Sequence, residues 1–255
     1  MRESGHLARI MENYMNKKII SAANQETYIF LPEGFNKVLL NLSGGTDSAM
    51  LLWQLLQYLR EEDVVLDEIR ALSGVDLYRP TSEWNASEIF LAIKEQFPEQ
   101  NLTHEIFRYW KQGEKKKYHI KHESKLREDE KFYALFHGRT ANPPKEEQKK
   151  ISGMWEDISR PSEREIEVVK ESNVQYVKNK ITYYNSVPWN AVDKKFIAEL
   201  YRKNSFMKEE VFPLTASCIS GNYVATDYWT KPCKECWWCK EKKWAFNAYD
   251  GETLE

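Results

Sequence analysis

The sequence predicts an α/β fold: a Rossmann-like, three-layer α/β/α arrangement with a mostly parallel sheet of about five strands. Short apolar runs alternate with amphipathic segments from residue 37 onwards, which is typical of βαβ units. The four cysteines all lie between residues 218 and 239, and they mark a small C-terminal segment. We therefore expect an α/β domain over residues 1–212 and a separate segment over 213–255.

The expected elements follow from hydrophobic periodicity and from breaks at glycine, proline and polar caps. The expected strands are a short one at 27–31 and core strands at 37–42, 67–75, 103–110, 132–136 and 181–187. The expected helices are a polar helix or arm at 1–25, an amphipathic helix at 47–60, a helix capped by Ser82 or Asn85 that ends at 97, and a helix at 193–203.

Residues 111–170 form a strongly charged insertion in the predicted α/β domain. Lysines at 115–117 and the charged run at 127–130 lie in its first part, and helical pieces are expected over 145–170. Mixed-sign charge is typical of a solvated surface helix or loop. A lid or a partner surface is the alternative interpretation.

A glycine-rich turn, Ser43-Gly44-Gly45-Thr46-Asp47-Ser48, joins the first core strand to its helix. Free N–H groups and the helix dipole at such a turn attract anions. Adjacent glycines let the backbone approach a phosphate, and the Ser and Thr hydroxyls add donors. Asp47 would repel phosphate unless it holds Mg²⁺ or orients the loop. The turn is neither a Walker loop nor a dinucleotide fingerprint, and an ordinary capped turn is the structural alternative.

The cysteines are spaced as metal ligands. Cys233, Cys236 and Cys239 form a C-x-x-C-x-x-C run, and Cys218 precedes it. Two-residue gaps let neighbouring thiolates bind one metal, and four thiolates suit a structural zinc ion. An iron–sulfur cluster accepts the same ligands, and disulfides are the third interpretation.

Composition argues against several classes of protein. The formal net charge of −2 does not fit a chain that is basic throughout and binds nucleic acid. No apolar run approaches the roughly 18 residues that a membrane span requires. Residues 1–18 lack the apolar core of a secretory signal, so we expect a cytoplasmic protein.

The loop Ser43-Gly44-Gly45-Thr46-Asp47-Ser48 resembles the signature loop of the PP-loop ATP pyrophosphatases. This superfamily includes GMP synthetase, asparagine synthetase, tRNA-thiolation enzymes and sulfonucleotide reductases. The resemblance implies that the six residues bind ATP and grip its pyrophosphate while AMP is transferred to a substrate. It does not specify that substrate.

The C-terminal residues narrow the resemblance. Ser217-Cys218, the run of three cysteines that follows, and Ala245-Phe246 are similar to the zinc segment of 7-cyano-7-deazaguanine synthases. That family carries the same Ser-Gly-Gly-x-Asp-Ser loop near its N-terminus. The resemblance implies Zn²⁺ at Cys218, Cys233, Cys236 and Cys239.

Two further matches lie between these regions. Lys194 and Ile197 match the Lys-x-x-Ile helix start of the family, and Gly138 fits its glycine at a strand end beside the nucleotide. Three features depart from the family. The gap from Cys218 to Cys233 is longer, Ala216 replaces the usual Trp, and residues 137–144 lack the Tyr-Pro-Asp-Cys run.

The resemblance implies an ATP-dependent carbon–nitrogen ligase that converts 7-carboxy-7-deazaguanine and ammonia to 7-cyano-7-deazaguanine, a step towards queuosine. ATP adenylates the carboxylate, ammonia displaces AMP to give an amide, and a second activation leaves the nitrile. The loop and Mg²⁺ would stabilise the departing pyrophosphate, with Asp47 holding Mg²⁺ or orienting the loop. Lys194 and Arg139 are candidates for contacts with phosphate or carboxylate, with surface charge as the alternative for both.

Two other functions remain open. One is another PP-loop adenylating enzyme, forming an amide or nitrile or thiolating a different substrate, although thiolation needs cysteines outside the metal site. The other is a non-catalytic nucleotide-binding module, against which the retained Asp47 argues. The expected partners are a small acid and ammonia, with no membrane and no direct nucleic acid; a homodimer is a further expectation.

Overall fold

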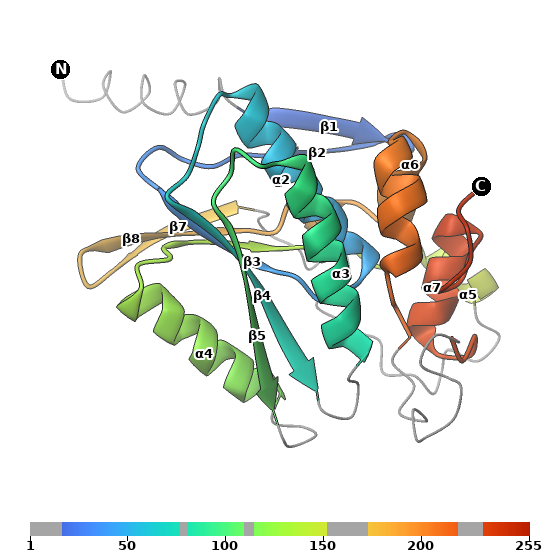
Figure 1. Ribbon diagram of the computed structural model, residues 1–255. Coiled ribbons are helices and arrows are strands. Elements are labelled where there is room, and N and C mark those ends of the chain that lie inside the picture. Colours follow the sequence, from blue (N-terminus) through green and yellow to red (C-terminus); the bar gives the residue numbers. More distant parts are fainter. Residues whose placement is uncertain (1–16, 77–80, 110–114, 152–172, 219–231) are drawn as a thin grey trace.

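The computed structural model describes residues 17–76, 81–109, 115–151, 173–218 and 232–255. Its centre is a sheet of six strands in the order β5-β4-β3-β6-β8-β7 (Figure 1). The strands are β3 (Lys37–Asn41), β4 (Glu68–Asp76), β5 (Leu102–Tyr109), β6 (Ala134–His137), β7 (Asn173–Lys178) and β8 (Ile181–Ser186). All neighbouring pairs are parallel except β7 with β8. The prediction of a mixed α/β fold with a mostly parallel sheet is confirmed.

The sixth strand, β7, was not predicted. It forms an antiparallel hairpin with β8 through Asn179 and Lys180, which both have positive φ, as a tight two-residue hairpin turn requires. Five of the six residues of β7 are exposed and the first is partly exposed. An edge strand with so little buried surface lacks the apolar run by which the other strands were recognised.

A separate two-stranded sheet corrects the prediction for the N-terminal region. β1 (Lys18–Ala22) pairs antiparallel with β2 (Gln25–Ile29) through a turn at Ala23 and Asn24. The expected helix or arm is therefore wrong for residues 18–22, whose alternation buries only Ile20 and Ala22. The strand expected at 27–31 exists as β2, while residues 1–16 of the expected helix or arm lie outside the described residues.

Helices follow most strands of the central sheet. The α-helices are α2 (Thr46–Glu61), α3 (Thr81–Gln96), α4 (Lys115–Asp129), α5 (Lys145–Ile151), α6 (Lys194–Arg202) and α7 (Trp237–Phe246), and the shorter turns are η3 (Pro188–Ala191), η4 (Met207–Val211) and η5 (Phe212–Leu214). The charged insertion thus contains α4 and α5, and its residues 152–170 lie outside the described part of the chain. No helix within the described ranges is both long and apolar enough to cross a membrane.

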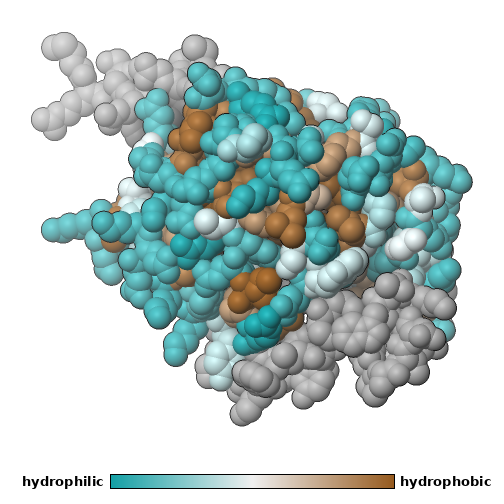
Figure 2. Space-filling model, viewed as in Figure 1, coloured by the Kyte–Doolittle hydropathy of each residue, from teal (hydrophilic) through white to brown (hydrophobic). Residues whose placement is uncertain are grey.

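Alternate residues of the core strands belong to two different apolar clusters, because successive side chains point to opposite faces of a sheet. Leu39 of β3 clusters with Leu126 of α4, whereas Val38 and Leu40 belong to the larger cluster that includes α2 and α3. In Figure 1, α4 lies to one side of β5 and α3 to the other. On the face drawn in Figure 2, hydrophobic residues form small patches among hydrophilic ones.

The strand order reverses beside β3. The chain leaves β3 for β4 and β5 on one side and then returns to β6 on the other side. The crevice outside the carboxyl ends of two such strands is the usual ligand site of open α/β sheets. Residues 43–48 follow β3 and Gly138 follows β6, so the fold brings both to this crevice.

His104 of β5 makes the stability of the protein depend on pH. Its Nε2 lies 2.8 Å from Ser73 Oγ, and its ring stacks on Phe90 at 4.9 Å. Burial lowers the pKa of His104 to about 4, against a weak opposing effect of Glu83. Because the unfolded chain binds the proton more readily, stability is intact above about pH 6.5 and is lost as the pH falls towards 4.

We expect His104→Gln to flatten part of this pH dependence. In wild type, His104 should reduce the free energy of unfolding by about 1 kcal/mol between pH 7 and pH 5, since partial exposure of the ring screens part of the shift. Urea unfolding of wild type and variant at both pH values measures the difference. Equal pH slopes for the two proteins would show that His104 does not titrate as described.

Candidate functional site

The predicted phosphate loop is an open helix start. Gly44 has a φ of +81°, a left-handed conformation that favours glycine. Gly45 is the N-cap of α2 and supplies no side-chain hydrogen bond to the helix. The first N–H groups of α2 therefore lack the capping side chain that usually satisfies them, and they can bind an external acceptor.

The two serines of the loop brace its ends. Ser48 Oγ accepts a hydrogen bond from the backbone N–H of Ser43 at 3.1 Å and lies 3.1 Å from Ser43 Oγ. It also donates to the carbonyl of Gly45 at 3.2 Å. Ser48 is buried and Ser43 is exposed. Ser48 thus shapes the loop, whereas Ser43 can also reach a ligand.

The carboxylate of Asp47 is held from several directions. Its Oδ1 accepts from Thr46 Oγ1 at 3.0 Å, and its Oδ2 accepts from Thr140 Oγ1 at 3.1 Å. Lys194 Nζ lies 3.5 Å from Oδ1. The backbone carbonyl of Asp47 accepts from Trp189 Nε1 at 3.1 Å. Asp47 therefore has a fixed orientation at the start of α2.

Lys194 is not a surface charge. Its side chain is 6% exposed, and Nζ lies between Asp47 Oδ1 and Glu241 Oε2, the latter at 3.3 Å. Asp193 caps α6 by accepting from the N–H of Lys195, which places Lys194 in the first turn. The surface-charge alternative is wrong for this residue, and sequence reasoning missed its partner Glu241.

Arg139 and Gly138 leave the end of β6 in different environments. Arg139 is exposed, and its Nε donates to Asn190 Oδ1 at 3.3 Å. A Cβ on Gly138 would lie 2.7 Å from the Cα of Ser48 and 2.8 Å from the carbonyl oxygen of Asp47. Only glycine allows β6 to approach the backbone of the predicted loop so closely. The contact of Arg139 with a substrate stays a prediction.

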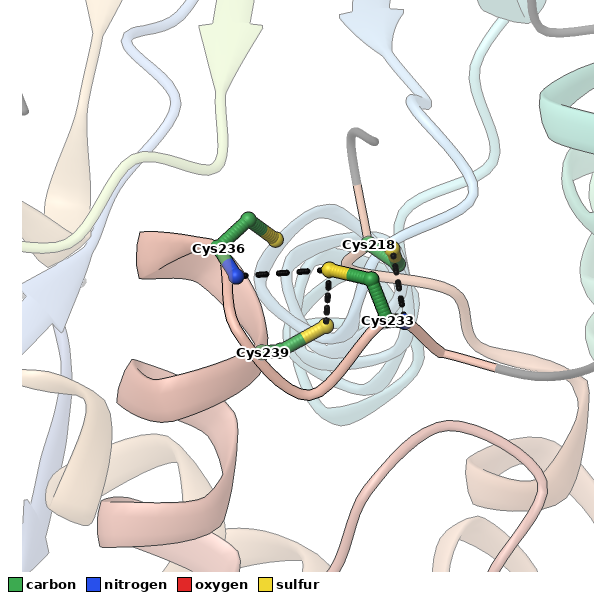
Figure 3. Close-up of side chains that lie close together, drawn as sticks. All are labelled: Cys218, Cys233, Cys236 and Cys239. Atoms are coloured by element: carbon green, nitrogen blue, oxygen red, sulfur yellow. Dashed lines mark hydrogen bonds between the residues drawn. The ribbon is translucent and has the colours of Figure 1, made fainter. Parts of the chain in front are cut away.

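The four cysteines form one cluster, shown in Figure 3. The sulfur atoms of Cys218, Cys233, Cys236 and Cys239 all lie within 4.8 Å of one another, and none forms a disulfide. Zn–S bonds of about 2.3 Å in a tetrahedron place neighbouring sulfurs about 3.8 Å apart. Cys233 Sγ and Cys239 Sγ lie 3.9 Å apart. The cluster could therefore hold a metal ion such as zinc.

Hydrogen bonding and charge in the cluster also fit a metal. The backbone N–H of Cys236 donates to Cys233 Sγ at 3.3 Å, and that of Cys233 donates to Cys218 Sγ at 3.4 Å. Hydrogen bonds with the sulfurs of Cys218 and Cys236, together with burial, raise the pKa of Cys239. The raised pKa favours the neutral thiol at Cys239. Four neighbouring thiolates would therefore need a bound cation to offset their negative charge.

A buried ion pair anchors the first cysteine of the cluster. Asp250 Oδ2 accepts from the N–H groups of Ser217 and Cys218, each at 2.8 Å. Lys242 Nζ donates to Asp250 Oδ1 at 2.7 Å and to Thr215 Oγ1 at 2.9 Å. Burial lowers the pKa of Lys242, and the charge of Asp250 opposes that effect. The residues before Cys218 are therefore held in place on both sides.

The four-cysteine cluster and the predicted loop are neighbours. The N–H of Ala216 donates to the carbonyl of Gly44 at 2.9 Å, two residues before Cys218. A Cβ on Gly45 would lie 3.5 Å from the carbonyl oxygen of Ala216. The segment that carries the first cysteine thus forms one wall of the glycine-rich loop.

A recess of about 340 Å³ lies away from the loop, lined by Ile151, Lys234, Lys240, Lys243, Trp244 and Tyr249. Lys234 pairs with Glu252 at 3.4 Å, and Lys243 donates to the carbonyl of Asn247. None of the predicted site residues lines this recess.

Fold and site together define a mixed α/β protein with a glycine-rich loop at the switch point of its sheet and a four-cysteine cluster suited to a metal. No model of a known protein family and no curated protein matches this chain.

Proposed function

We propose that this protein is an ATP-dependent carbon–nitrogen ligase that adenylates 7-carboxy-7-deazaguanine and converts it with ammonia to 7-cyano-7-deazaguanine. The observation that carries the proposal is the uncapped start of α2 at the switch point, with the carboxylate of Asp47 and the buried amine of Lys194 3.5 Å apart beside it. An anion at this helix start meets N–H groups, the helix dipole and a lysine together.

The residues of the loop would share the work of adenylation. The N–H groups at the start of α2 bind the pyrophosphate and stabilise the charge that develops as it departs. Lys194, held between Asp47 and Glu241, places its ammonium group at the helix start, where burial limits screening by solvent. Ser48 and Gly138 keep the loop in the shape that exposes these groups.

Asp47 fits the usual magnesium arrangement of one or two carboxylates with substrate phosphates. Bound Mg²⁺ would supply charge neutralisation on the pyrophosphate. Thr46 and Thr140 hold the Asp47 carboxylate in one orientation, so its oxygens need little reorganisation to bind a cation.

The Zn²⁺ ion would be structural. Four thiolates fill a tetrahedral shell and leave no open position for a substrate. Through Ala216 and its bond to Gly44, the metal segment would support the phosphate loop from outside.

The proposal includes the finer features of the fold. We place residues 1–212 in a Rossmann-like three-layer domain and 213–255 in a zinc-binding segment, supported by the apolar clusters around Leu39 and Leu40. The segment packs on the domain, since Phe246 contacts Tyr201 and Phe212. We place the enzyme in the cytoplasm, where metal-binding thiols persist.

A second candidate is a PP-loop adenylating enzyme for a different acid. The 7-cyano-7-deazaguanine synthases usually have Trp at the position of Ala216. Ala216 donates a backbone hydrogen bond to Gly44 and so lies directly against the loop. A smaller side chain at this wall would admit a differently shaped substrate.

Pyrophosphate release measured with ATP, ammonium and 7-carboxy-7-deazaguanine tests the proposal. We expect turnover in wild type and a fall of about 10²- to 10³-fold in kcat for Asp47→Ala, because a charge-stabilising group is lost. Glu62→Ala, exposed at the opposite end of α2, is the matched control and should keep full activity.

Each outcome of that assay has a separate meaning. Turnover with another acid only would support the second candidate. No pyrophosphate from any acid, with ATP still bound, would favour a nucleotide-binding module and overturn the enzyme proposal. Mass spectrometry of the product distinguishes the nitrile from an amide.

A further inference from the structure

A second polar cluster lies at the same crevice and is not explained by ATP binding. Asn41 is the last residue of β3 and His137 the last of β6, and the two strands are paired at these residues. Asn41 Nδ2 lies 2.8 Å from His137 Nδ1 and 3.3 Å from Glu123 Oε2 of α4. Three elements therefore converge on one amide group.

The cluster adjoins the predicted phosphate loop. Asn41 precedes Ser43 by two residues, and His137 directly precedes Gly138, which contacts the backbone of Ser48. A substrate whose carboxylate is adenylated at the loop would extend from there along the carboxyl ends of β3 and β6. The position of the cluster suits the part of the substrate away from the reacting carboxylate.

The hydrogen-bonding capacity of the cluster is only partly used. Asn41 Oδ1 is buried and has no hydrogen-bond partner among the described residues. Leaving a buried acceptor unsatisfied is costly, so a ligand that donates to it is favoured. The Glu123 side chain is 14% exposed, and its Oε2 lies 3.7 Å from His119 Nε2. The cluster can therefore accept further N–H donors.

His137 can act as the complementary donor. Burial lowers the pKa of His137 to about 4, so the imidazole is neutral at pH 7. Because its Nδ1 faces the Asn41 amide N–H₂ and accepts from it, the proton is assigned to Nε2. Nε2–H can then donate to a carbonyl oxygen of the ligand.

We propose that Glu123, Asn41 and His137 form a binding site for the hydrogen-bonding edge of a guanine-type base. Glu123 accepts from the ring N–H and the exocyclic amino group, Asn41 Oδ1 accepts from the same amino group, and His137 donates to the ring carbonyl. This edge presents adjacent N–H donors beside a carbonyl acceptor, which matches the two acceptors and one donor of the cluster. The inference rests on the proposed function and names the group that selects its substrate.

The arrangement of acceptors and donor in the cluster discriminates between purine-type bases. A hypoxanthine-type ring lacks the exocyclic amino group, and an adenine-type ring has no ring N–H at this edge. Each leaves a buried acceptor of the cluster without a donor, which costs far more affinity than a lost apolar contact. The cluster therefore selects the guanine pattern over these two.

Glu123→Gln tests the site, since it keeps the size of the side chain and replaces one acceptor oxygen with a donor. Binding of 7-carboxy-7-deazaguanine and of the analogue lacking the amino group is measured by calorimetry. We expect the variant to bind the guanine-type acid about 10- to 100-fold more weakly than wild type does. The two proteins should bind the analogue to within about threefold of each other, because the amino group is then absent and the one acceptor oxygen of Gln can still accept from the ring N–H.

Glu128→Gln is the matched control, because Glu128 lies on the same helix but is exposed and pairs with Lys178. It should leave both affinities unchanged. ATP binding by Glu123→Gln should equal that of wild type, which separates loss of base recognition from damage to the loop. Equal losses of affinity for both ligands in Glu123→Gln, or none, would overturn the inference.

The assay also separates this inference from the proposed function. Guanine-selective binding that depends on Glu123, without pyrophosphate release, supports the site and contradicts the ligase. Pyrophosphate release that is unaffected by Glu123→Gln keeps the ligase and removes the site. A wild-type protein that binds neither acid contradicts both.

Discussion

Removal of the proposed zinc ion is expected to unfold residues 232–255 and to eliminate the proposed ATP binding. Structural zinc in zinc-finger peptides contributes about 10–16 kcal/mol of binding free energy at neutral pH, which is comparable with the whole free energy of unfolding of a typical domain. The segment has one helix, α7, and its loop residues are held mainly by the four cysteines and Asp250. Without the metal, the crowded thiols would have no common ligand to organise them.

The effect should reach the glycine-rich loop over a short path of two residues and one hydrogen bond. Cys218 lies two residues after Ala216, whose N–H holds the carbonyl of Gly44. If Cys218 is released, Asp250 still holds its N–H, but the cluster that aligns residues 216–218 is gone. We therefore expect Cys239→Ser, which removes the buried ligand, to weaken ATP binding at least tenfold.

Metal analysis of the purified protein should find about one zinc ion per chain. Hydrogen exchange with and without a chelator should show faster exchange over 232–255 and around residues 43–48. Glu235→Ser is the matched control, because Glu235 lies between two cysteines and is exposed. Purified protein with neither zinc nor iron would contradict the metal assignment, and unchanged exchange around 43–48 would contradict the coupling.

The order of the main elements, the glycine-rich turn at a helix start and the cysteine cluster could be predicted from the sequence because their signals are local. A strand, two glycines and a helix lie next to one another, and three of the cysteines lie within seven residues of sequence. The strands β7 and β1 could not be predicted from the sequence, because both form by pairing with a neighbouring strand and bury few side chains.

The supports of the candidate site come from distant parts of the chain. Thr140 and Trp189 reach Asp47 from 93 and 142 positions away, and Tyr201 donates to the carbonyl of Thr46 across 155 positions. No local pattern marks such residues, because each has an ordinary place in its own element. Glu241 was missed for a related reason: a charged residue in a charged run predicts exposure, yet it is fully buried beside Lys194.

Replacement of Gly138 by Ala is expected to destabilise the protein and to disrupt the loop together. The added Cβ would lie 2.7–2.8 Å from backbone atoms of Asp47 and Ser48, which cannot rotate away as a side chain can. Either β6 or the start of α2 must shift, and overpacking of this kind costs about 1–3 kcal/mol or more. A shift of α2 also misaligns the N–H groups proposed to bind pyrophosphate, so ATP affinity should fall at least tenfold.

Gly45→Ala is the informative comparison, because its Cβ would make only ordinary contacts at 3.5 Å. Its φ of −97° is also accessible to alanine, so the free energy of unfolding should change by about 1 kcal/mol or less. If phosphate approaches the loop as proposed, the new methyl group should nevertheless weaken ATP binding. Urea unfolding and calorimetry on both variants separate the two roles: Gly138 is required for packing of the strand, and Gly45 for access of the ligand. Normal ATP binding by Gly45→Ala would place the nucleotide elsewhere, whatever the stability of Gly138→Ala.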